Sequence, residues 1–512
     1  MKLKDLLLLS AFIAVGSPSF AQYANDALMF SQFEQGATAR FKGLGNAQTA
    51  LGGDLSSLAG NPAGLGLFTR SEISLGTDFS NHKVESQYIN QFSNSNKDRF
   101  GINNGGVVFH SPSWRSRGED LKTGWLSVNF GAGFNRTNNF NTTIDYSGKN
   151  PTSSVADFFA DQADLFSKTN NSGLVDPTVD KTALSGSALA EMAWQNFLIE
   201  FNPAGYFPTT QLNNNQQNVV FRTGSQSEVN FAVGANYSNQ LYLGASVGLS
   251  TLNFNSDRTF TESGSTNPFI DPRLNGTYNL SYRTSQTTRG TGANLKAGMI
   301  YRANDFLRVG LSMASPTWFR INDSFSEVLD TRYTNFNYTN TPAVYDFSYD
   351  LRTPFRINGG LAFILAQKGL LSADVEYLDY SSIKITSDSR DVDALDNSAI
   401  RNNYKSAVNF RVGGEYKVID NFMIRAGYDY MGSPYRHQQN QYAYTRVYTG
   451  GIGYRAKLLY FDVAYQNRTF KTSNTPYVID PGYPDFDQTG PGQTALLKHN
   501  NNSVFLTIGT RF

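Results

Sequence analysis

Apolar and polar residues alternate along many short segments of this chain. In "VNFAVGANY" (229–237), the larger apolar side chains occupy every second position from Val229 to Tyr237. Further segments with this pattern are "LYLGASVGL" (241–249), "LLSADVEYL" (370–378), "VNFRVGGEYK" (408–417), "NFMIRAGYDY" (421–430) and "LYFDVAYQ" (459–466). A period of two predicts strands with one polar and one apolar face.

The segments are about ten residues long, which is the length that a tilted strand needs to cross a bilayer. The links between strands are short at 238–240, 303–305, 366–369, 418–420 and 456–458, and long at 81–100, 261–276, 322–343, 383–402 and 471–501. Short periplasmic turns and long outer loops are typical of bacterial outer-membrane barrels. A soluble sandwich would show the alternation without this asymmetry between the two ends.

Counting backwards from the C-terminus gives about fourteen strands. They are expected near 71–80, 101–112, 123–136, 218–237, 240–260, 277–302, 305–321, 344–366, 369–382, 403–417, 421–434, 442–456, 458–470 and 502–512. The sequence therefore predicts an all-β fold, a transmembrane antiparallel β-barrel over residues 71–512. Phe512 shares a strand face with Val504 and Ile508, so the last residue is expected in the lipid-facing aromatic belt.

Residues 1–21 have the pattern of a signal peptide. Lys2 and Lys4 form a basic start, an apolar run of about ten residues follows, and Ala21 is a small residue before the expected mature start at Gln22. The run is too short to span a membrane; a buried helix of a soluble protein is the alternative. We expect an exported protein of the outer membrane of a Gram-negative bacterium.

Composition supports this class and excludes others. Charged residues make up 17% of the chain and the net charge is +1, so nucleic acid is not an expected partner. Aromatic residues reach 14%, which suits girdles at a lipid interface. There is no cysteine, and the four histidines (His82, His110, His437 and His499) are not spaced as metal ligands. Without a catalytic motif, we expect no enzyme, metal site or cofactor.

The segment 22–70 lacks the alternation of a strand. Its main part, "QGATARFKGLGNAQTALGGDLSSLAGNPAGLGLF" (35–68), is rich in glycine, alanine and leucine. Asn61 followed by Pro62 is typical of a helix N-terminus, because Asn caps and Pro suits the first helical position. Gly64 and Gly66 are candidates for a hinge. The segment is expected to fold inside the barrel; a flexible periplasmic tail is the alternative, but tails rarely carry so many leucines.

"ARFKGLGNAQTALGGDLSSLAGNPAGL" (39–65) resembles the N-terminal hatch of the FadL family, the outer-membrane long-chain fatty acid transporters. Asn61, Pro62 and Ala63 match the Asn-Pro-Ala core of that family, and Gly64 follows it. The resemblance implies a fourteen-stranded barrel plugged by residues 22–70, with Asn61 to Gly64 as part of a gating hatch. Outside these roughly thirty residues the likeness is one of architecture.

The resemblance also implies an opening in the barrel wall near the third strand. Here that strand reads "VNFGAGFNR" (128–136), and Gly131 and Gly133 fall on the same face. Inward glycines weaken a strand and mark either a bend or a close approach of another backbone. They are therefore candidates for a lateral opening, or they make room for the plug.

The stretch between about 137 and 217 is expected to be a partly helical extracellular insert. The segments 155–166 and 183–201 follow helical spacing. The insert resembles the helical outer loops with which FadL family members catch ligands. The resemblance makes Phe158, Phe159, Met192 and Phe197 candidates for ligand capture. The alternative is a helix that only packs over the barrel mouth.

Mixed charges are expected on the inward faces of the strands. The inward positions include Lys296, Arg308, Asp374, Glu376, Arg411, Glu415, Arg425, Asp429 and Asp462. Most are expected to form ion pairs that brace the wall, since buried charges need partners. An arginine or lysine among them could instead bind a ligand carboxylate.

The leading functional hypothesis is passive uptake of hydrophobic small molecules, such as long-chain fatty acids, by a monomeric barrel. The expected partners are that ligand, outer-membrane lipid and the barrel assembly machinery. Phe512 is expected to be the assembly signal, because the C-terminus resembles that of other outer-membrane proteins, which commonly end in an aromatic strand of this kind. The alternative is a FadL-like barrel that serves as a protein partner or shuttle in a secretion system. A general diffusion porin is a third option, and the hatch argues against it.

Overall fold

The computed structural model describes residues 18–512, except 115–119, 121, 171–172, 268–269, 271–273, 366–367, 437–442 and 481–491. Most of the expected signal peptide therefore lies outside the described residues. Among the described helices none is long and apolar enough to cross a membrane.

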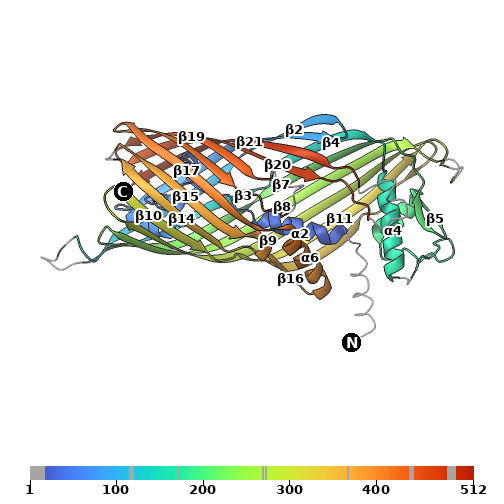
Figure 1. Ribbon diagram of the computed structural model, residues 1–512, viewed down its shortest axis with the longest axis horizontal. Helices are drawn as coiled ribbons and strands as arrows, with labels where there is room; N and C mark the ends of the chain where they lie inside the picture. Colours follow the sequence, from blue (N-terminus) through green and yellow to red (C-terminus); the bar gives the residue numbers. More distant parts are fainter. Residues whose placement is uncertain are drawn as a thin grey trace.

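The chain forms a closed antiparallel barrel of fourteen wall strands (Figure 1), as the alternation predicted. In chain order the wall consists of β1 (Glu72–Tyr88), β2 (Gln91–Pro112), β3 (Trp125–Asn139) continued by β4 (Thr142–Asn150), β7 (Asn214–Tyr237), β8 (Leu241–Ser265), β9 (Thr277–Arg302), β10 (Leu307–Ala314) continued by β11 (Trp318–Tyr333), β13 (Ala343–Arg352) continued by β14 (Arg356–Leu365), β15 (Gly369–Asp379) continued by β16 (Lys384–Ser387), β17 (Ser406–Ile419), β18 (Phe422–Met431), β19 (Thr445–Ala456), β20 (Leu459–Asn474) and β21 (Ala495–Arg511). The short β12 (Asn337–Tyr338) pairs with β11, and β21 pairs with β1 to close the barrel.

The outward face of the last strand is apolar, as expected. Val504, Leu506 and Ile508 are exposed, and Phe512 is 63% exposed while its N–H donates to the Ser71 carbonyl. The role of Phe512 as an assembly signal stays a prediction.

Several strands extend beyond the predicted ends. The expected long loop at 81–100 is instead a hairpin, in which β1 and β2 pair up to Tyr88–Gln91 around a turn at Ile89 and Asn90. Outside the bilayer both faces of a strand contact water, so the ladder continues after the apolar alternation has ended. This is why the pattern marked only the membrane part of these strands.

The extracellular insert is smaller than predicted, because β4 pairs with β7 from Thr142–Arg222 to Asn150–Asn214. The remaining insert contains α4 (Val155–Asn170), α5 (Ala188–Gln195) and the hairpin of β5 (Ile199–Asn202) and β6 (Gly205–Pro208). The helix expected at 183–201 is therefore shorter. It ends before Phe197, whose left-handed φ of 56° turns the chain into the hairpin.

The N-terminal segment lies inside the barrel and contacts wall strands around most of its circumference. It contains α2 (Pro18–Ser31), α3 (Ala39–Gly43) and the 3-10 helices η1 (Leu55–Leu58) and η2 (Pro62–Leu67). Figure 1 shows α2, in blue, among the strands at mid-length of the barrel, close to α6 (Arg390–Asn403). We call residues 23–68 the hatch.

Candidate functional site

The hatch fits the barrel through inward-facing glycines of the wall. A Cβ atom on Gly234 would lie 2.6 Å from the Cβ of Leu65, and Cβ atoms on Gly244, Gly310 and Gly413 would collide with hatch backbone atoms. The same holds, against hatch backbone or side chains, for Gly131, Gly133, Gly298, Gly360 and Gly427. Backbone lies against backbone at these positions, so the docked hatch is closely packed on the wall.

The Asn-Pro-Ala corner of the hatch is wedged against β8, β9 and β10. Asn61 caps η2, as predicted: its Oδ1 accepts from the Ala63 N–H at 3.1 Å, and its Nδ2 donates to the Thr49 carbonyl at 2.7 Å. A Cβ on Gly64 would lie 2.8 Å from the Cα of Gly52. Gly64 is thus a position of close packing, and the structure gives no support for a hinge there.

Three inward charges of the wall hold the hatch, and one of them, Glu415, also pairs with Arg425 of the wall. One oxygen of Asp374 accepts from the backbone N–H groups of Gln48 and Thr49 at 2.8 and 2.9 Å. Arg308 donates to a hatch carbonyl at 3.1 Å, and Glu415 accepts from a hatch arginine at 3.1 and 3.2 Å. The sequence identified these side chains as inward but gave no signal of their partners, since most are backbone groups.

Other inward charges form ion pairs within the wall, as expected. Lys296 pairs with Glu228, Arg411 pairs with Glu376, and Arg425 donates to Asp462 at 2.7 Å. The Asp429 carboxylate is 1% exposed, and Arg411 is its nearest cation at 3.6 Å. These groups brace the barrel at the level of the hatch.

Beyond the hatch glycines, towards the outer end, the lumen is apolar and α2 fills it. Phe30 of α2 packs edge-on against Phe140 and Phe254, with ring centroids 5.7 and 5.6 Å apart. Further buried members of this lumen cluster are Ala24, Ala27, Leu28, Leu252, Phe319, Ile321, Tyr349, Leu351, Leu378, Tyr380, Ile383, Ile385, Ile400, Tyr404 and Ala407. The wall here suits an apolar guest, and part of the hatch occupies the space.

Two buried carboxylates lie at this helix. Asp26 of α2 accepts from the Gln286 amide at 2.8 Å, and burial raises the pKa of Asp26 to about 7. Asp396 of α6 is fully buried, and burial beside Asp393 and Asp26 raises its pKa to about 7. Both groups favour the protonated state while α2 is docked.

One stretch of the wall lacks a backbone ladder. The pairing of β2 with β3 ends at Asn104–Asn135, and residues 91–103 and 136–150 form no ladder with each other. Instead, Ser93 Oγ donates to the Asp145 carbonyl at 2.6 Å and Ser95 Oγ donates to the Thr143 carbonyl at 2.5 Å. We call this stretch the seam.

Ion pairs bridge the lower end of the seam. Asp78 of β1 accepts from Arg99 of β2 at 2.8 Å and from Arg136 of β3 at 2.9 Å. All three side chains are less than 15% exposed, so solvent screens the pairs only weakly. Side chains therefore replace the missing backbone hydrogen bonds.

The hatch is bonded directly to the irregular part of β3 at the seam. The Glu34 N–H donates to the Thr137 carbonyl at 2.7 Å, and Asn138 Nδ2 donates to the carbonyls of Met29 and Gln32 at 3.1 Å. The β3–β7 register shifts between Arg136 and Asn138. A displacement of residues 29–34 would thus pull on the seam.

Gly131 and Gly133 lie below the seam, where β3 is paired on both sides. Their Cβ atoms would lie 2.7 and 2.6 Å from methyl carbons of Leu58 in the hatch. Of the two interpretations, the structure favours room for the plug. The irregular backbone lies a few residues further on, in the asparagine-rich stretch 135–141.

The insert brings the predicted capture residues together, but as a packed core. Phe158 and Phe159 of α4 and Met192 of α5 are 7%, 0% and 5% exposed, and Phe197 packs against the same cluster. The Phe159 ring lies 5.8 Å from Tyr282 of β9, so the insert is attached to the wall. These side chains are not an exposed ligand-catching surface in this state.

Comparison with known proteins agrees with this architecture. Residues 141–481 match the family described as outer membrane protein transport protein (OMPP1/FadL/TodX). A Pseudomonas aeruginosa FadL homologue has the same fold, with 12% identity over 93% of this chain and 98% of that chain and a TM-score of 0.53. The Pseudomonas putida toluene transporter TodX is 13% identical over 94% and 100%, with a TM-score of 0.51.

No curated protein matches the chain. The family match begins at residue 141, so the likeness of the hatch rests on residues 39–65 alone. The match still covers well over half of the chain, and it agrees with the closed fourteen-stranded wall. The chain is therefore an outer-membrane barrel and belongs to the OMPP1/FadL/TodX family of outer-membrane transport proteins.

Proposed function

We propose that the protein takes up hydrophobic small molecules passively across the outer membrane, with long-chain fatty acids as one candidate class. The ligand enters the lumen from outside, replaces the apolar side chains of α2 in the lumen cluster, and leaves sideways into the bilayer through the lower end of the seam, at Arg99 and Arg136. Asn61, Pro62, Ala63 and Gly64 keep the floor of the barrel closed during this passage.

The observation that carries the proposal is the bonding of hatch residues 29–34 to the seam. An apolar ligand gains from leaving water in proportion to its buried area, so it competes with Phe30 and Leu28 for the same wall. Displacing α2 disturbs the contacts at Thr137 and Asn138. The tight packing of the hatch on the wall glycines supports a lateral rather than an axial exit.

The insert is proposed to act as a lid. Phe158, Phe159, Met192 and Phe197 meet a ligand only if α4 and α5 move away from β9 and β11. Within the described residues no contact favours the alternative role as a protein partner in secretion.

A cross-link across the seam tests this function. Because the chain has no cysteine, Ser95→Cys with Thr143→Cys gives a unique pair that a short thiol-specific cross-linker can join. Joining should reduce uptake of a fluorescent fatty acid at least tenfold, and reduction of a cleavable linker should restore it. The control pair, Ser80→Cys with Ser503→Cys, joins partners of the intact β1–β21 ladder and should leave uptake unchanged. Normal uptake through a fully cross-linked seam would exclude the lateral route.

A further inference from the structure

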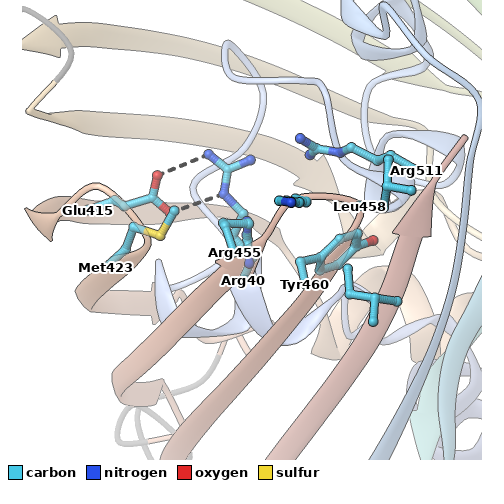
Figure 2. Close-up of a pocket in the computed structure, with 9 residues that line it drawn as sticks. Arg40, Glu415, Met423, Arg455, Leu458, Tyr460 and Arg511 are labelled. Carbon is cyan, nitrogen blue, oxygen red and sulfur yellow. Dashed lines mark hydrogen bonds and ion pairs between the residues drawn. The ribbon is translucent and has the colours of Figure 1, made fainter.

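A small cavity of about 250 Å³ lies at the end of the barrel that carries the short turns. This is the end opposite the insert with α4 and α5 (Figure 1). It is bounded by α3 of the hatch and by the ends of β17 to β21, and Figure 2 shows its side chains. The lining residues are Arg40, Glu415, Met423, Arg455, Lys457, Leu458, Leu459, Tyr460 and Arg511. The cavity thus joins the hatch to the wall on the periplasmic side.

Positive charge dominates this cavity. Four of its lining side chains are cationic and Glu415 is the one acid among them. Figure 2 shows Arg40, Arg455 and Arg511 grouped around this cavity. Like charges in such a space repel each other unless an anion lies between them.

Each guanidinium is held by an acid on one edge. Arg511 Nε donates to Glu72 at 2.8 Å and Arg455 Nη1 donates to Asp462 at 3.0 Å. Arg40 uses its Nε and Nη2 on Glu415, at 3.1 and 3.2 Å. In the described part of the chain, Arg40 Nη1, Arg455 Nη2 and both Nη atoms of Arg511 keep free N–H groups.

An aromatic ring fixes two of these groups in place. The Tyr460 ring centroid lies 4.9 Å from the guanidinium carbon of Arg455 and 5.7 Å from that of Arg511. The Tyr460 hydroxyl donates to Glu72 at 2.6 Å, the same carboxylate that holds Arg511. The donors are therefore pre-positioned, which lowers the entropy cost of binding.

Arg40 is an arginine of this cluster that a solute can reach and whose acidic partner has a second arginine bound to it. Glu415 also accepts from Arg425 at 2.6 Å, and the Arg425 side chain is fully buried between two acids. The Arg40 side chain keeps 18% exposure, and among the described residues Glu415 is the one acid that forms an ion pair with it. A solute in the cavity can reach Arg40 but not Arg425.

We propose that this cavity binds a small oxyanion, a carboxylate or phosphate group that arrives from the periplasm, between Arg40, Arg455 and Arg511. The planar fork of arginine matches the oxygens of such groups. Because Arg40 belongs to the hatch and the other two to β19 and β21, the bound anion clamps the hatch to the wall. Occupancy opposes displacement of the hatch and thereby links transport to the periplasmic side.

Binding is tested on the purified full-length protein in detergent, with inorganic phosphate titrated against chloride at constant ionic strength. We expect a saturable rise in the unfolding temperature, and slower hydrogen exchange of residues 36–46. Arg455→Gln with Arg511→Gln should weaken binding at least tenfold. Arg302→Gln is the matched control, since Arg302 lies at the same end, outside the cavity, and pairs with Asp305 at 2.6 Å.

Two further arms separate the sources of the anion. Glycerol phosphate and acetate test free solutes, and nanodiscs of phosphatidylglycerol against phosphatidylcholine test a lipid headgroup. A response to any of these that requires Arg455 and Arg511 supports an oxyanion site and names its source. An equal response in the arginine variant and the control means an adventitious ion only, and overturns the proposal, as does no response in any arm. Neither outcome depends on the route of uptake.

Discussion

Two pairs of long neighbouring strands in this barrel are built differently. β8 and β9 pair without a break from Leu241–Tyr301 to Ser265–Thr277, whereas β2 and the β3–β4 strand pair only between Asn104–Asn135 and Pro112–Ser127. The first pair is held by backbone bonds that no side-chain motion can release. Beyond its short ladder, the second pair is joined by two serine hydroxyls and one carboxylate, so only side chains hold the outer part of these strands together.

The difference also shows in what lies inside each pair. Behind β8 and β9, the Asn61–Ala63 corner rests on Gly244 and Gly298 in rigid contact. Behind the seam, residues 29–34 of the hatch form hydrogen bonds with Thr137 and Asn138 in the irregular part of β3. In the proposed opening, the stretch of wall without a backbone ladder therefore lies beside the part of the hatch that moves.

The largest effect is expected from Asp78→Asn, which leaves Arg99 and Arg136 without their shared acid. Breaking a buried pair costs about 3–5 kcal/mol, and here the loss falls on the seam. Glu228→Gln, which removes the partner of Lys296 behind the continuous ladder, is the matched control. Both variants should unfold at a lower temperature, but only Asp78→Asn should raise uptake, by several fold. Equal uptake in the two would remove the distinction between seam and ladder.

A smaller effect is expected from a larger side chain at the inward face of the β8–β9 pair, where the hatch packs on glycine. Gly244→Val overpacks the contact with Pro62 at a cost of about 1–3 kcal/mol. The hatch should then become sensitive to protease between residues 44 and 65. Gly359→Val is the control, because a Cβ on Gly359 would meet no atom within 4 Å. A hatch equally resistant in both variants would contradict the close packing described here.

Removing the two seam hydroxyls should have a milder effect than the loss of Asp78. Ser93→Ala with Ser95→Ala removes two hydrogen bonds, each worth about 1 kcal/mol. Hydrogen exchange of residues 142–146 should become faster, while exchange in the matching part of β8 stays the same. Unchanged exchange would mean that the hydroxyls do not hold the seam.

The weakest expected effect is a dependence of α2 docking on pH. Asp26 and Asp396 have pKa values of about 7 in the docked state, above the usual value near 4 of an exposed carboxyl. Undocked carboxyls therefore lose protons first, and docking weakens as the pH rises from about 4 to about 7. The protection factors of residues 23–31, which correct hydrogen exchange for its intrinsic pH dependence, should be higher at pH 5.5 than at pH 8, and Asp396→Asn should reduce this difference. A docking stability that rises with pH would contradict the assignment.

The sequence predicts the wall well because lipid outside and polar groups inside impose a period of two on every strand. It fails where that contrast ends, as at residues 81–100, where both strand faces meet water. The N-cap at Asn61 was predictable, since the cap and its helix are adjacent in the chain. The attachment of Asp374 to the Gln48 and Thr49 N–H groups was not, because the partners are backbone atoms more than 300 residues away.

The seam left only a faint signal in the sequence. The stretch "FNRTNNFNTT" (134–143) interrupts the alternation with asparagines, and the amide of one of them, Asn138, donates to the hatch. Gly131 and Gly133 are the more visible feature of this strand, but a glycine in a strand has two explanations, a bend or a close approach of another backbone. The position of Leu58 against both glycines distinguishes the two explanations.

Spin labels across the two strand pairs test the central claim most directly. Nitroxides at Asn94→Cys and Asp145→Cys flank the seam, and nitroxides at Thr259→Cys and Arg283→Cys sit on directly paired positions of β8 and β9. In lipid nanodiscs, adding oleate or toluene should reduce the dipolar broadening of the seam pair and leave the β8–β9 pair unchanged. Identical broadening of the seam pair with and without a ligand that the protein transports would contradict a wall that opens at the seam.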